Sequence, residues 1–283
     1  MNKDNLDQIS DWNGAVGRQW AALQLDLDAM IKPFGDAALV VAAAKPGQGV
    51  IDIGCGCGDT SIALAREVGQ LGSVLGIDVS LPMLEVARVR AATAQLPNLD
   101  FSHADASTAE LPAGIDLLYS RFGVMFFNQP ASALRHMRKA LVSGGRIVFA
   151  CWRTPRDNPW AMAPLVAARK VLNITPEPAD PFAPGPFAFA DEVRLHQILV
   201  DAGFEHVAIE RFDAEVVLGK SVHAAAESST RIGPVARLLQ ELGDQHLQVV
   251  VDAVKSAFEA SANLDGRVIM KGSTWIVSAR NPA

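Results

Sequence analysis

Apolar residues along this chain follow two different spacings, which alternate over its first half. Short apolar runs of strand length stand at 49–53, 73–77, 99–103, 115–119 and 145–150. Longer stretches in which apolar residues return at helical spacing stand at 59–68, 82–94 and 131–141. Such alternation predicts a parallel sheet covered by helices on both faces. Ligands of these sheets bind beyond the carboxyl ends of the strands.

Three segments outside this alternation have patterns of their own. The first, 1–48, carries an apolar face at helical spacing and predicts a helical lid. The second, 151–190, is rich in proline and aromatic residues and predicts a long irregular loop over a ligand pocket. The third, 221–262, is helical by pattern and predicts a cap inserted before the last strand. The core is then expected to comprise 49–220 and 263–283.

Three glycines at alternating positions follow the first predicted strand, in the run Asp52-Ile53-Gly54-Cys55-Gly56-Cys57-Gly58-Asp59. Glycine lets the chain turn sharply and leaves no Cβ between the backbone and a ligand. A helix is expected to start at Asp59-Thr60-Ser61, where side-chain oxygens offer caps for free N–H groups. The helix start also adds a positive dipole end. The sequence therefore predicts a loop that cradles a nucleotide-like cofactor.

The spacing of these glycines distinguishes between two kinds of cofactor loop. The dinucleotide pattern G-x-G-x-x-G would require glycine at position 59, where this chain has Asp59. An NAD-dependent oxidoreductase is therefore the less favoured alternative. The next apolar strand ends at Asp78, twenty residues beyond Gly58. A carboxylate there can accept hydrogen bonds from both hydroxyls of a ribose.

The acidic-x-Gly-x-Gly-x-Gly run resembles motif I of the class I S-adenosylmethionine-dependent methyltransferases, in particular the ubiquinone/menaquinone-methyltransferase-like subgroup. Later elements resemble the same family in order: the segment after Asp78, a strand leading to Asp105, the strand at 115–120, and the Gly144-Gly145 turn before the fifth strand. The resemblance implies an α/β, Rossmann-like sheet of seven strands, mostly parallel with an antiparallel last strand. It also implies S-adenosyl-L-methionine as the cofactor and methyl transfer as the reaction.

Candidate site residues come from the strand ends and from this resemblance. By resemblance, the residues after Asp78 line the adenine and Asp105 accepts a hydrogen bond from its amine. The candidates for cofactor contact are Asp52, Gly54, Cys55, Gly56, Gly58, Asp78, Val79, Met83, Asp105, Ala106, Ser120 and Phe122 in the core, with Gln19 and Trp20 in the lid. The candidates for acceptor contact are Trp12, Arg121, Trp152, Arg153, Trp160 and Phe187.

A general base cannot be assigned from the sequence. Methyl transfer from a sulfonium depends chiefly on alignment, and only some acceptors need a base. Elimination among the six histidines leaves His223, in the expected cap, as a weak candidate. A complete site beneath a lid favours an enzyme that methylates a small, apolar or aromatic acceptor at oxygen, nitrogen or carbon. A non-catalytic subunit that senses S-adenosylmethionine remains the other alternative.

Composition and charge narrow the class of partner and compartment. The formal charge is 25 minus 31, or −6, and no window is rich in Lys and Arg, which disfavours a nucleic-acid partner. Cys55 and Cys57 have no further ligands at zinc-like spacing, so no metal site is expected. The N-terminus is not a signal peptide and no apolar stretch reaches the roughly 18 residues of a membrane span, so a cytoplasmic protein is expected. Pairing of cap helices into a homodimer stays open.

Overall fold

The structure, a computed structural model, describes residues 5–176 and 180–283, and the chain divides into two compact units. The first unit comprises Met1–Trp152, Phe182–Phe212 and Thr274–Ala283. The second comprises Arg153–Pro181 and Asp213–Ser273. The glycine loop and all of the predicted cofactor residues belong to the first unit.

A seven-stranded sheet forms the centre of the first unit. In spatial order its strands are β3 (Leu99–His103), β2 (Ser73–Asp78), β1 (Gly49–Ile53), β4 (Ile115–Arg121), β5 (Leu141–Trp152), β7 (Val268–Arg280) and β6 (Glu205–Gly219). β1 to β5 pair in parallel, whereas β7 pairs with β5 in the antiparallel sense. The expected Rossmann-like fold is therefore confirmed. β6 and β7 are long strands that also contribute residues to the second unit.

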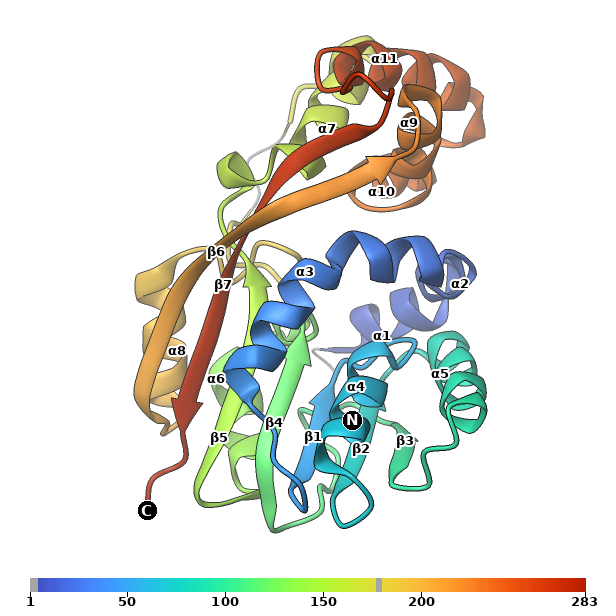
Figure 1. Ribbon diagram of the computed structural model, residues 1–283. Coiled ribbons are helices and arrows are strands. Elements are labelled where there is room, and N and C mark those ends of the chain that lie inside the picture. Colours follow the sequence, from blue (N-terminus) through green and yellow to red (C-terminus); the bar gives the residue numbers. More distant parts are fainter. Residues whose placement is uncertain (1–4, 177–179) are drawn as a thin grey trace. The chain divides into compact units, whose positions relative to one another are not determined.

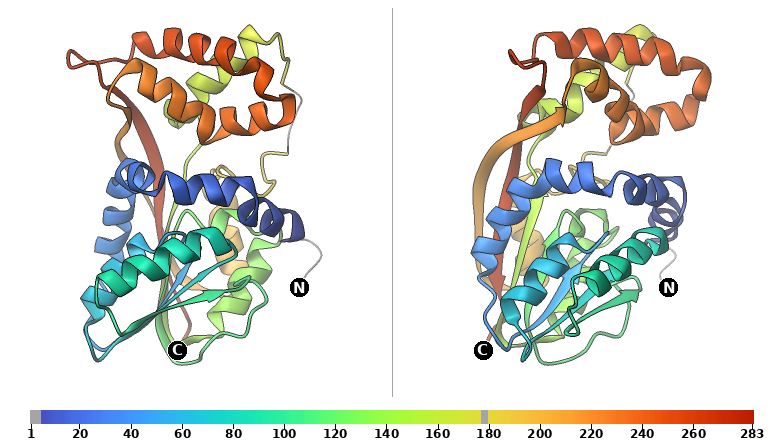
Figure 2. Two further views of the ribbon diagram at one scale, coloured as in Figure 1. Left: turned by 90° about the vertical axis from the view of Figure 1, so that its right-hand side faces the viewer. Right: turned by 45° about the vertical axis from the view of Figure 1, so that its right-hand side comes forward.

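Helices cover both faces of this sheet (Figures 1 and 2). One face is covered by α3 (Gln24–Ala42), α4 (Asp59–Val68) and α5 (Leu81–Thr93), whose buried side chains share an apolar cluster with the central strands. On the other face α6 (Pro130–Arg138) contacts α8 (Glu192–Asp201). Two short helices, α1 (Leu6–Asn13) and α2 (Ala15–Ala22), precede α3, and α2 contacts α5.

The starts of α8 and α4 differ in whether a side chain caps the free N–H groups. Asp191 caps α8 as its side chain predicts, since its Oδ1 accepts a hydrogen bond from the Arg194 N–H at 2.8 Å. The corresponding prediction for α4 is wrong. Gly58 is the N-cap of α4 and no side chain bonds to the free N–H groups there. The polar side chains of the first turn of α4 bond to other partners, described below.

The second unit contains four α-helices among its described residues. They are α7 (Pro159–Val171), α9 (Val222–Arg231), α10 (Pro234–Leu242) and α11 (Leu247–Glu259), and their buried faces form one apolar cluster. The helix α7 differs from the irregular loop expected over 151–190. Pro159 fits at the start of this helix, and burial of Pro164 and Leu165 offsets the loss of one helical hydrogen bond.

Asn158 joins α7 to β7 inside the second unit. Its side chain is fully buried, accepts hydrogen bonds from the Ser273 N–H at 2.9 Å and the Trp160 Nε1–H at 3.0 Å, and donates to the Ser273 carbonyl at 3.0 Å.

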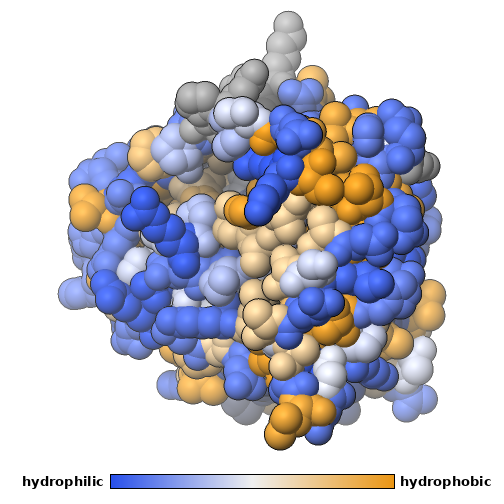
Figure 3. All heavy atoms as spheres, turned by 90° about the horizontal axis from the view of Figure 1, so that it is seen from above, coloured by the Kyte–Doolittle hydropathy of each residue, from blue (hydrophilic) through white to orange (hydrophobic). Residues whose placement is uncertain are grey.

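Figure 3 shows hydrophobic patches beside hydrophilic side chains on one outer face. No helix in 5–176 or 180–283 is long and apolar enough to cross a bilayer.

Candidate cofactor site

The glycine loop between β1 and α4 depends on backbone conformations that favour glycine. Gly54, Gly56 and Gly58 have φ angles of 66°, 54° and 81°. A Cβ on Gly54 would lie 2.7 Å from the Cα of Gly123, and one on Gly58 would lie 3.0 Å from the ring of Phe101. A side chain at either position would therefore collide with its neighbour and strain the backbone. Burial raises the pKa of the Cys57 thiol to about 12, so Cys57 is a neutral spacer in the loop.

Asp52 is completely buried beneath this loop. Its Oδ2 accepts hydrogen bonds from the Thr60 hydroxyl at 2.8 Å and the Ser61 hydroxyl at 2.6 Å, which explains why neither caps α4. Its Oδ1 is buried and has no partner among the described residues. Burial raises the pKa of Asp52 to about 6, against the opposing effect of the two hydroxyls and the charge of Arg121. The unused oxygen is therefore an acceptor whose hydrogen-bonding capacity is not satisfied by the described residues.

Asp78 stands at the carboxyl end of β2 and bonds to two loops at once. Its Oδ2 accepts from the Gly56 N–H at 2.8 Å, and its Oδ1 accepts from the Ser80 N–H at 2.8 Å. Burial raises the pKa of this carboxyl, although the backbone hydrogen bonds oppose the shift. Asp78 therefore orders the glycine loop from the neighbouring strand, and each oxygen keeps a lone pair for a ligand.

Asp105, which follows β3, accepts a hydrogen bond from Asn5, a residue that the sequence analysis missed. Asn5 is 8% exposed, and its Nδ2 donates to Asp105 Oδ2 at 3.0 Å and to the Ser107 hydroxyl at 3.1 Å. The other Asp105 oxygen accepts from the Ser107 N–H at 2.9 Å. An amide –NH2 group thus already occupies the carboxylate at which a purine amine is expected.

The end of β4 lies directly against the glycine loop. Ser120 donates its hydroxyl to the Ile53 carbonyl at 2.7 Å and accepts from the Gly123 N–H at 3.1 Å, so this candidate ties β4 to β1. Phe122 has a φ of 65°, which is rare for a non-glycine residue, and its N–H donates to the Ala150 carbonyl. Backbone strain of this kind clusters at functional sites.

An aromatic cluster surrounds Phe122 in the first unit. Its ring stacks on Trp152 with centroids 4.3 Å apart and planes at 9°. Phe34 from α3 meets both rings edge-on, at 6.2 Å and 5.0 Å. Trp152 is 5% exposed and Phe34 is fully buried, whereas Phe122 is only half-buried. Phe122 is therefore the most exposed of these three rings.

Helices α1 and α2 dock on the loop that follows β2. The Ser80 hydroxyl donates to the Trp12 carbonyl at 2.6 Å. Asn13 donates to the Val79 carbonyl and accepts from the Leu81 N–H at 3.0 Å. Trp12 also packs edge-on against Trp20 at 5.5 Å. These contacts bring the predicted lid residues Trp12 and Trp20 to the same side of the site as Val79.

Four charged side chains join α3, α4, α5 and β4 beside the glycine loop. Arg121 donates to Asp28 Oδ1 and Asp59 Oδ2, both at 2.9 Å. Arg90 pairs with the remaining oxygens of the same two carboxylates, at 3.0 Å and 3.2 Å. Burial lowers the pKa of Arg121, but the charges of Asp28 and Asp59 outweigh it and raise the pKa above its usual range. Arg121, expected to contact the acceptor, is thus engaged inside this network.

The remaining acceptor and catalytic candidates are distributed over both units. Phe187 is half-buried in the first unit. In the second, Arg153 pairs with Asp157 and Asp213, and Trp160 donates to Asn158. His223 lies on α9 with 62% of its side chain exposed and pairs with Glu227 one turn away. An exposed imidazole paired along its own helix has the surroundings of a surface residue.

The sequence analysis missed Asn5, Asn13, Asp28 and Arg90. Asp28 follows Leu27 in an amphipathic helix, and Arg90 lies among the polar positions of α5. Both therefore have the pattern of ordinary helix-surface residues. The two asparagines stand in a polar terminal segment that contains no motif. Only their contacts with distant residues reveal their roles.

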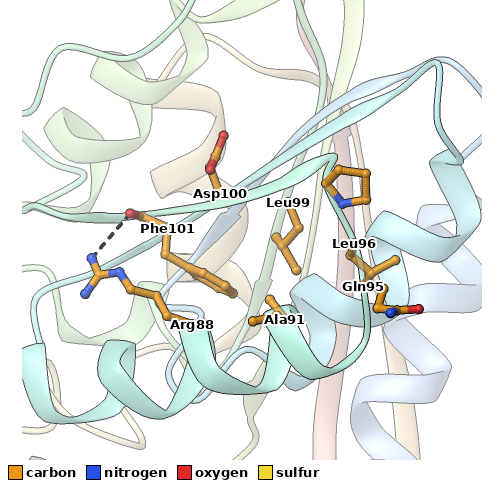
Figure 4. A pocket seen from close by; sticks show the side chains of 9 residues that line it. Arg88, Ala91, Gln95, Leu96, Leu99, Asp100 and Phe101 are labelled. Carbon is orange, nitrogen blue, oxygen red and sulfur yellow. Dashed lines mark hydrogen bonds between the residues drawn. The ribbon is translucent and has the colours of Figure 1, made fainter.

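A separate hollow of about 550 Å³ lies between α5 and β3 (Figure 4). Arg88 donates to the Phe101 carbonyl across it at 3.4 Å. The Phe101 ring also lines the hollow, and the same ring packs against Gly58. The hollow therefore lies behind the glycine loop, with the Phe101 ring between them.

The residues of the first unit fit an adenosyl cofactor with an amino-acid tail. The loop conformation brings the backbone within reach of a ligand, Asp78 and Asp105 offer acceptors at successive strand ends, and Asp52 keeps one buried oxygen unused. A family model described as "Methyltransferase domain" matches residues 50–145, which include all three carboxylates. Residues 50–145 thus form a class I S-adenosylmethionine-dependent methyltransferase domain. S-adenosyl-L-methionine is accordingly its cofactor.

Similar proteins support this family membership. The methyltransferase is 29% identical over 180 residues to the ubiquinone/menaquinone biosynthesis C-methyltransferase UbiE of Shewanella frigidimarina, covering 59% of this chain and 70% of that protein. It is 36% identical over 118 residues to the aklanonic acid methyltransferase DauC of Streptomyces sp. strain C5, covering 41% of this chain and only 54% of DauC. The YcgJ protein of Bacillus subtilis has a similar fold, with a TM-score of 0.59 at 17% identity over 89% of this chain and 99% of that one.

Proposed function

We propose that this methyltransferase transfers the methyl group of S-adenosylmethionine to a small, apolar and aromatic acceptor. The observation that carries the proposal is the half-buried Phe122 ring, which stacks on Trp152 at the end of β4 beside the glycine loop. A planar acceptor can stack on such a ring. The names of two relatives support this choice, since one acts on aklanonic acid and the other in quinone biosynthesis.

The proposed cofactor contacts follow from the carboxylates at the strand ends. Asp78 would hold the ribose hydroxyls, and Asp105 would accept from the adenine amine once Asn5 shares or leaves this carboxylate. Val79 and Met83 would line the adenine, with Ala106 beside Asp105. The unpartnered Oδ1 of Asp52 would take the ammonium of the methionine tail, directly or through water. Lone carboxylate oxygens in these positions are strong acceptors for charged and polar donors.

The reaction proposed here depends on alignment and on exclusion of water. The cofactor supplies an electrophilic methyl group on a sulfonium. The glycine loop and Asp78 would fix its position, while the aromatic group around Phe122 would orient the acceptor and keep water away. Alignment of this kind lowers a barrier by several kcal/mol, up to roughly 7–11 in well-oriented systems. Aromatic faces also stabilise a cation by about 0.5–2 kcal/mol.

Neither His103 nor His136, the histidines of β3 and α6, is assigned the role of general base. The His103 Nε2 lies 3.0 Å from the Val79 carbonyl, and the His136 Nε2 lies 2.8 Å from the Ala109 carbonyl. Both rings are therefore engaged with the backbone. The acceptor hydroxyl, amine or activated carbon would then lose its proton to solvent.

Calorimetric titration with S-adenosylmethionine, S-adenosylhomocysteine and NAD tests this function. We expect micromolar binding of both adenosyl compounds. Asp78→Ala should weaken it by about 1–3 kcal/mol because charged hydrogen bonds are lost. Asp78→Asn, which keeps the size and one acceptor oxygen, should show a smaller loss. Binding of NAD alone would exclude the methyltransferase reaction.

A screen of phenolic and quinol acceptors separates a catalyst from a sensor of the cofactor. We expect S-adenosylhomocysteine to form in the presence of a planar aromatic acceptor. Phe122→Ala should raise the KM for that acceptor more than it lowers the affinity for the cofactor. Tight cofactor binding without turnover of aromatic or other small acceptors would favour the sensor.

A further inference from the structure

The network of Asp28, Asp59, Arg90 and Arg121 is a closed ring of four ion pairs. Each carboxylate bridges both guanidinium groups, with N–O distances between 2.9 and 3.2 Å. The side chains are between 10% and 34% exposed, with Arg121 the most buried. The four charges cancel, and each arginine pairs with one oxygen of each of the two carboxylates. Hydrogen bonds between ionised groups of this kind are stronger than those between neutral groups.

This ring connects the helix α3 to the glycine loop. Asp28 comes from α3, whereas Asp59 is the first residue of α4, immediately after Gly58. Arg90 also donates to the carbonyl of Cys57, inside the loop, at 2.8 Å. The Arg90 side chain therefore links Asp28 to the loop backbone, and the Arg121 side chain links Asp28 to Asp59.

A second feature of the α3 sequence, Gly35, also brings this helix close to Arg121. Gly35 lies in the interior of the helix, where glycine is unfavourable. A Cβ at this position would lie 2.8 Å from the Cδ of Arg121, and the Gly35 carbonyl accepts a hydrogen bond from the Tyr119 hydroxyl at 3.1 Å. The missing side chain lets α3 pack directly along the stem of Arg121.

We propose that Asp28 is a positioning residue that makes α3 and the glycine loop adopt their cofactor-binding arrangement together. The proposal rests on the cofactor site described above. Movement of α3 away from the loop would take Asp28 from both arginines and leave one carboxylate to neutralise two guanidinium groups. This charge imbalance would affect Arg90, whose guanidinium group donates a hydrogen bond to the Cys57 carbonyl in the loop. Any ligand that orders the loop therefore also favours a docked α3, and the coupling is reciprocal.

Cofactor affinity in Asp28→Asn tests this coupling against a matched control. Asp36 is on the same helix and pairs with Lys32 on the exposed surface, at 2.6 Å, without contact to the loop. We expect Asp28→Asn to weaken binding of S-adenosylhomocysteine by about tenfold, Asp36→Asn to leave it unchanged, and Asp28→Glu to restore part of it. Calorimetry at a temperature where all variants are folded measures these affinities. Equal affinity of Asp28→Asn and the wild type would overturn the proposal.

Hydrogen exchange of the unmodified protein gives an independent test that needs no variant. Addition of S-adenosylhomocysteine should slow amide exchange in α3 around Asp28 as well as in 54–59. Protection of 54–59 without protection of α3 would show that the two move independently and would refute the coupling. Failure of the wild type to bind any adenosyl compound would instead contradict the proposed function.

Discussion

The N-terminal helices are attached to the core at two places with opposite chemistry. At the glycine loop, α3 is held by a ring of four charges that are largely withdrawn from water. Beside β2, α1 is held by neutral groups, namely the Asn13 side chain and the Ser80 hydroxyl. The first attachment touches the loop that would surround the methionine end of the cofactor. The second touches the residues expected at the adenine.

The difference shows how each attachment responds when one member is lost. Removal of one charge from a buried network leaves its partners desolvated and unpaired, which is costly even where the intact network adds little. Removal of a neutral hydrogen bond costs less, because water can reach the freed group at a helix surface. The ionic attachment should therefore behave as a unit with the loop, whereas the neutral attachment should be lost gradually.

Among the replacements that test this comparison, that of Arg121 should have the largest effect on the free energy of unfolding. Arg121→Met should lower the free energy of unfolding by about 3–5 kcal/mol, because Asp28 and Asp59 lose a buried partner. Urea denaturation followed by circular dichroism measures this change. Arg121→Lys is the control: it keeps the charge but cannot bridge two carboxylates, so its loss should be smaller. A loss below about 1 kcal/mol in Arg121→Met would show that the ring contributes little.

Asp52 gives the loop side a pH dependence, whereas the Asn13 amide and the Ser80 hydroxyl that hold α1 do not titrate. Its pKa is raised from 3.8 to about 6, so the folded protein binds a proton more tightly than the unfolded chain. The stability contributed by this proton is present below pH 4 and is lost as the pH rises through about 6, by roughly 3 kcal/mol in total. Unfolding of Asp52→Asn at pH 5 and pH 7, compared with the wild type, isolates this contribution. An identical pH dependence of the two proteins would contradict it.

The same titration should appear in cofactor binding with the opposite sign. An ammonium group favours the ionised carboxylate, so affinity for S-adenosylmethionine should rise as the pH increases through about 6. Binding near pH 6 should release a proton from Asp52. Calorimetry in two buffers of different ionisation enthalpy detects that release. Arg121→Met should move the midpoint upward, because the Arg121 charge lowers the pKa of Asp52.

Replacement of Asn13 should have the smallest effect of the three. Asn13→Ala removes the hydrogen bonds to the Val79 carbonyl and the Leu81 N–H, and should cost about 1–2 kcal/mol of unfolding free energy. Asn13→Asp keeps the acceptor but sets a carboxylate oxygen against the Val79 carbonyl, so its loss should be at least as large. Added salt should leave the Asn13→Ala effect unchanged but reduce that of Arg121→Met. A salt-sensitive Asn13→Ala effect would remove the distinction between the two attachments.

Parallel strands and their polar ends could be predicted from the sequence because their signals are local. The short apolar runs place Asp52 near the end of the first strand, Asp78 at the end of the second and Asp105 just after the third. Carboxylates in these positions gather toward one edge of a parallel sheet whatever the side chains around them do. The structure confirms the sheet, and it brings Asp78 into contact with Gly56. The roles of individual groups were less predictable. Thr60 and Ser61 bond to a buried carboxylate instead of capping their own helix.

The helix α7 and the ring of four charges could not be predicted from the sequence, because both depend on contacts between residues far apart in the chain. Prolines lower helix propensity locally, but burial of the α7 face in the second unit outweighs that penalty. Asp28 and Arg121 are separated by many residues, and either charge alone has the pattern of a solvent-exposed side chain. Arg121 was therefore assigned to the acceptor, whereas the structure pairs it with two carboxylates.

The sequence by itself determined the order of strands and helices, the glycine loop and the carboxylates that identify the cofactor, since each depends on neighbouring residues and on the chirality of the chain. The tertiary structure decided which groups attach the N-terminal helices, which oxygen of Asp52 remains unused and which aromatic ring stays most exposed. Those outcomes depend on burial and on partners far apart in the chain. Their energies are set by desolvation and by long-range contacts, which no local sequence pattern records.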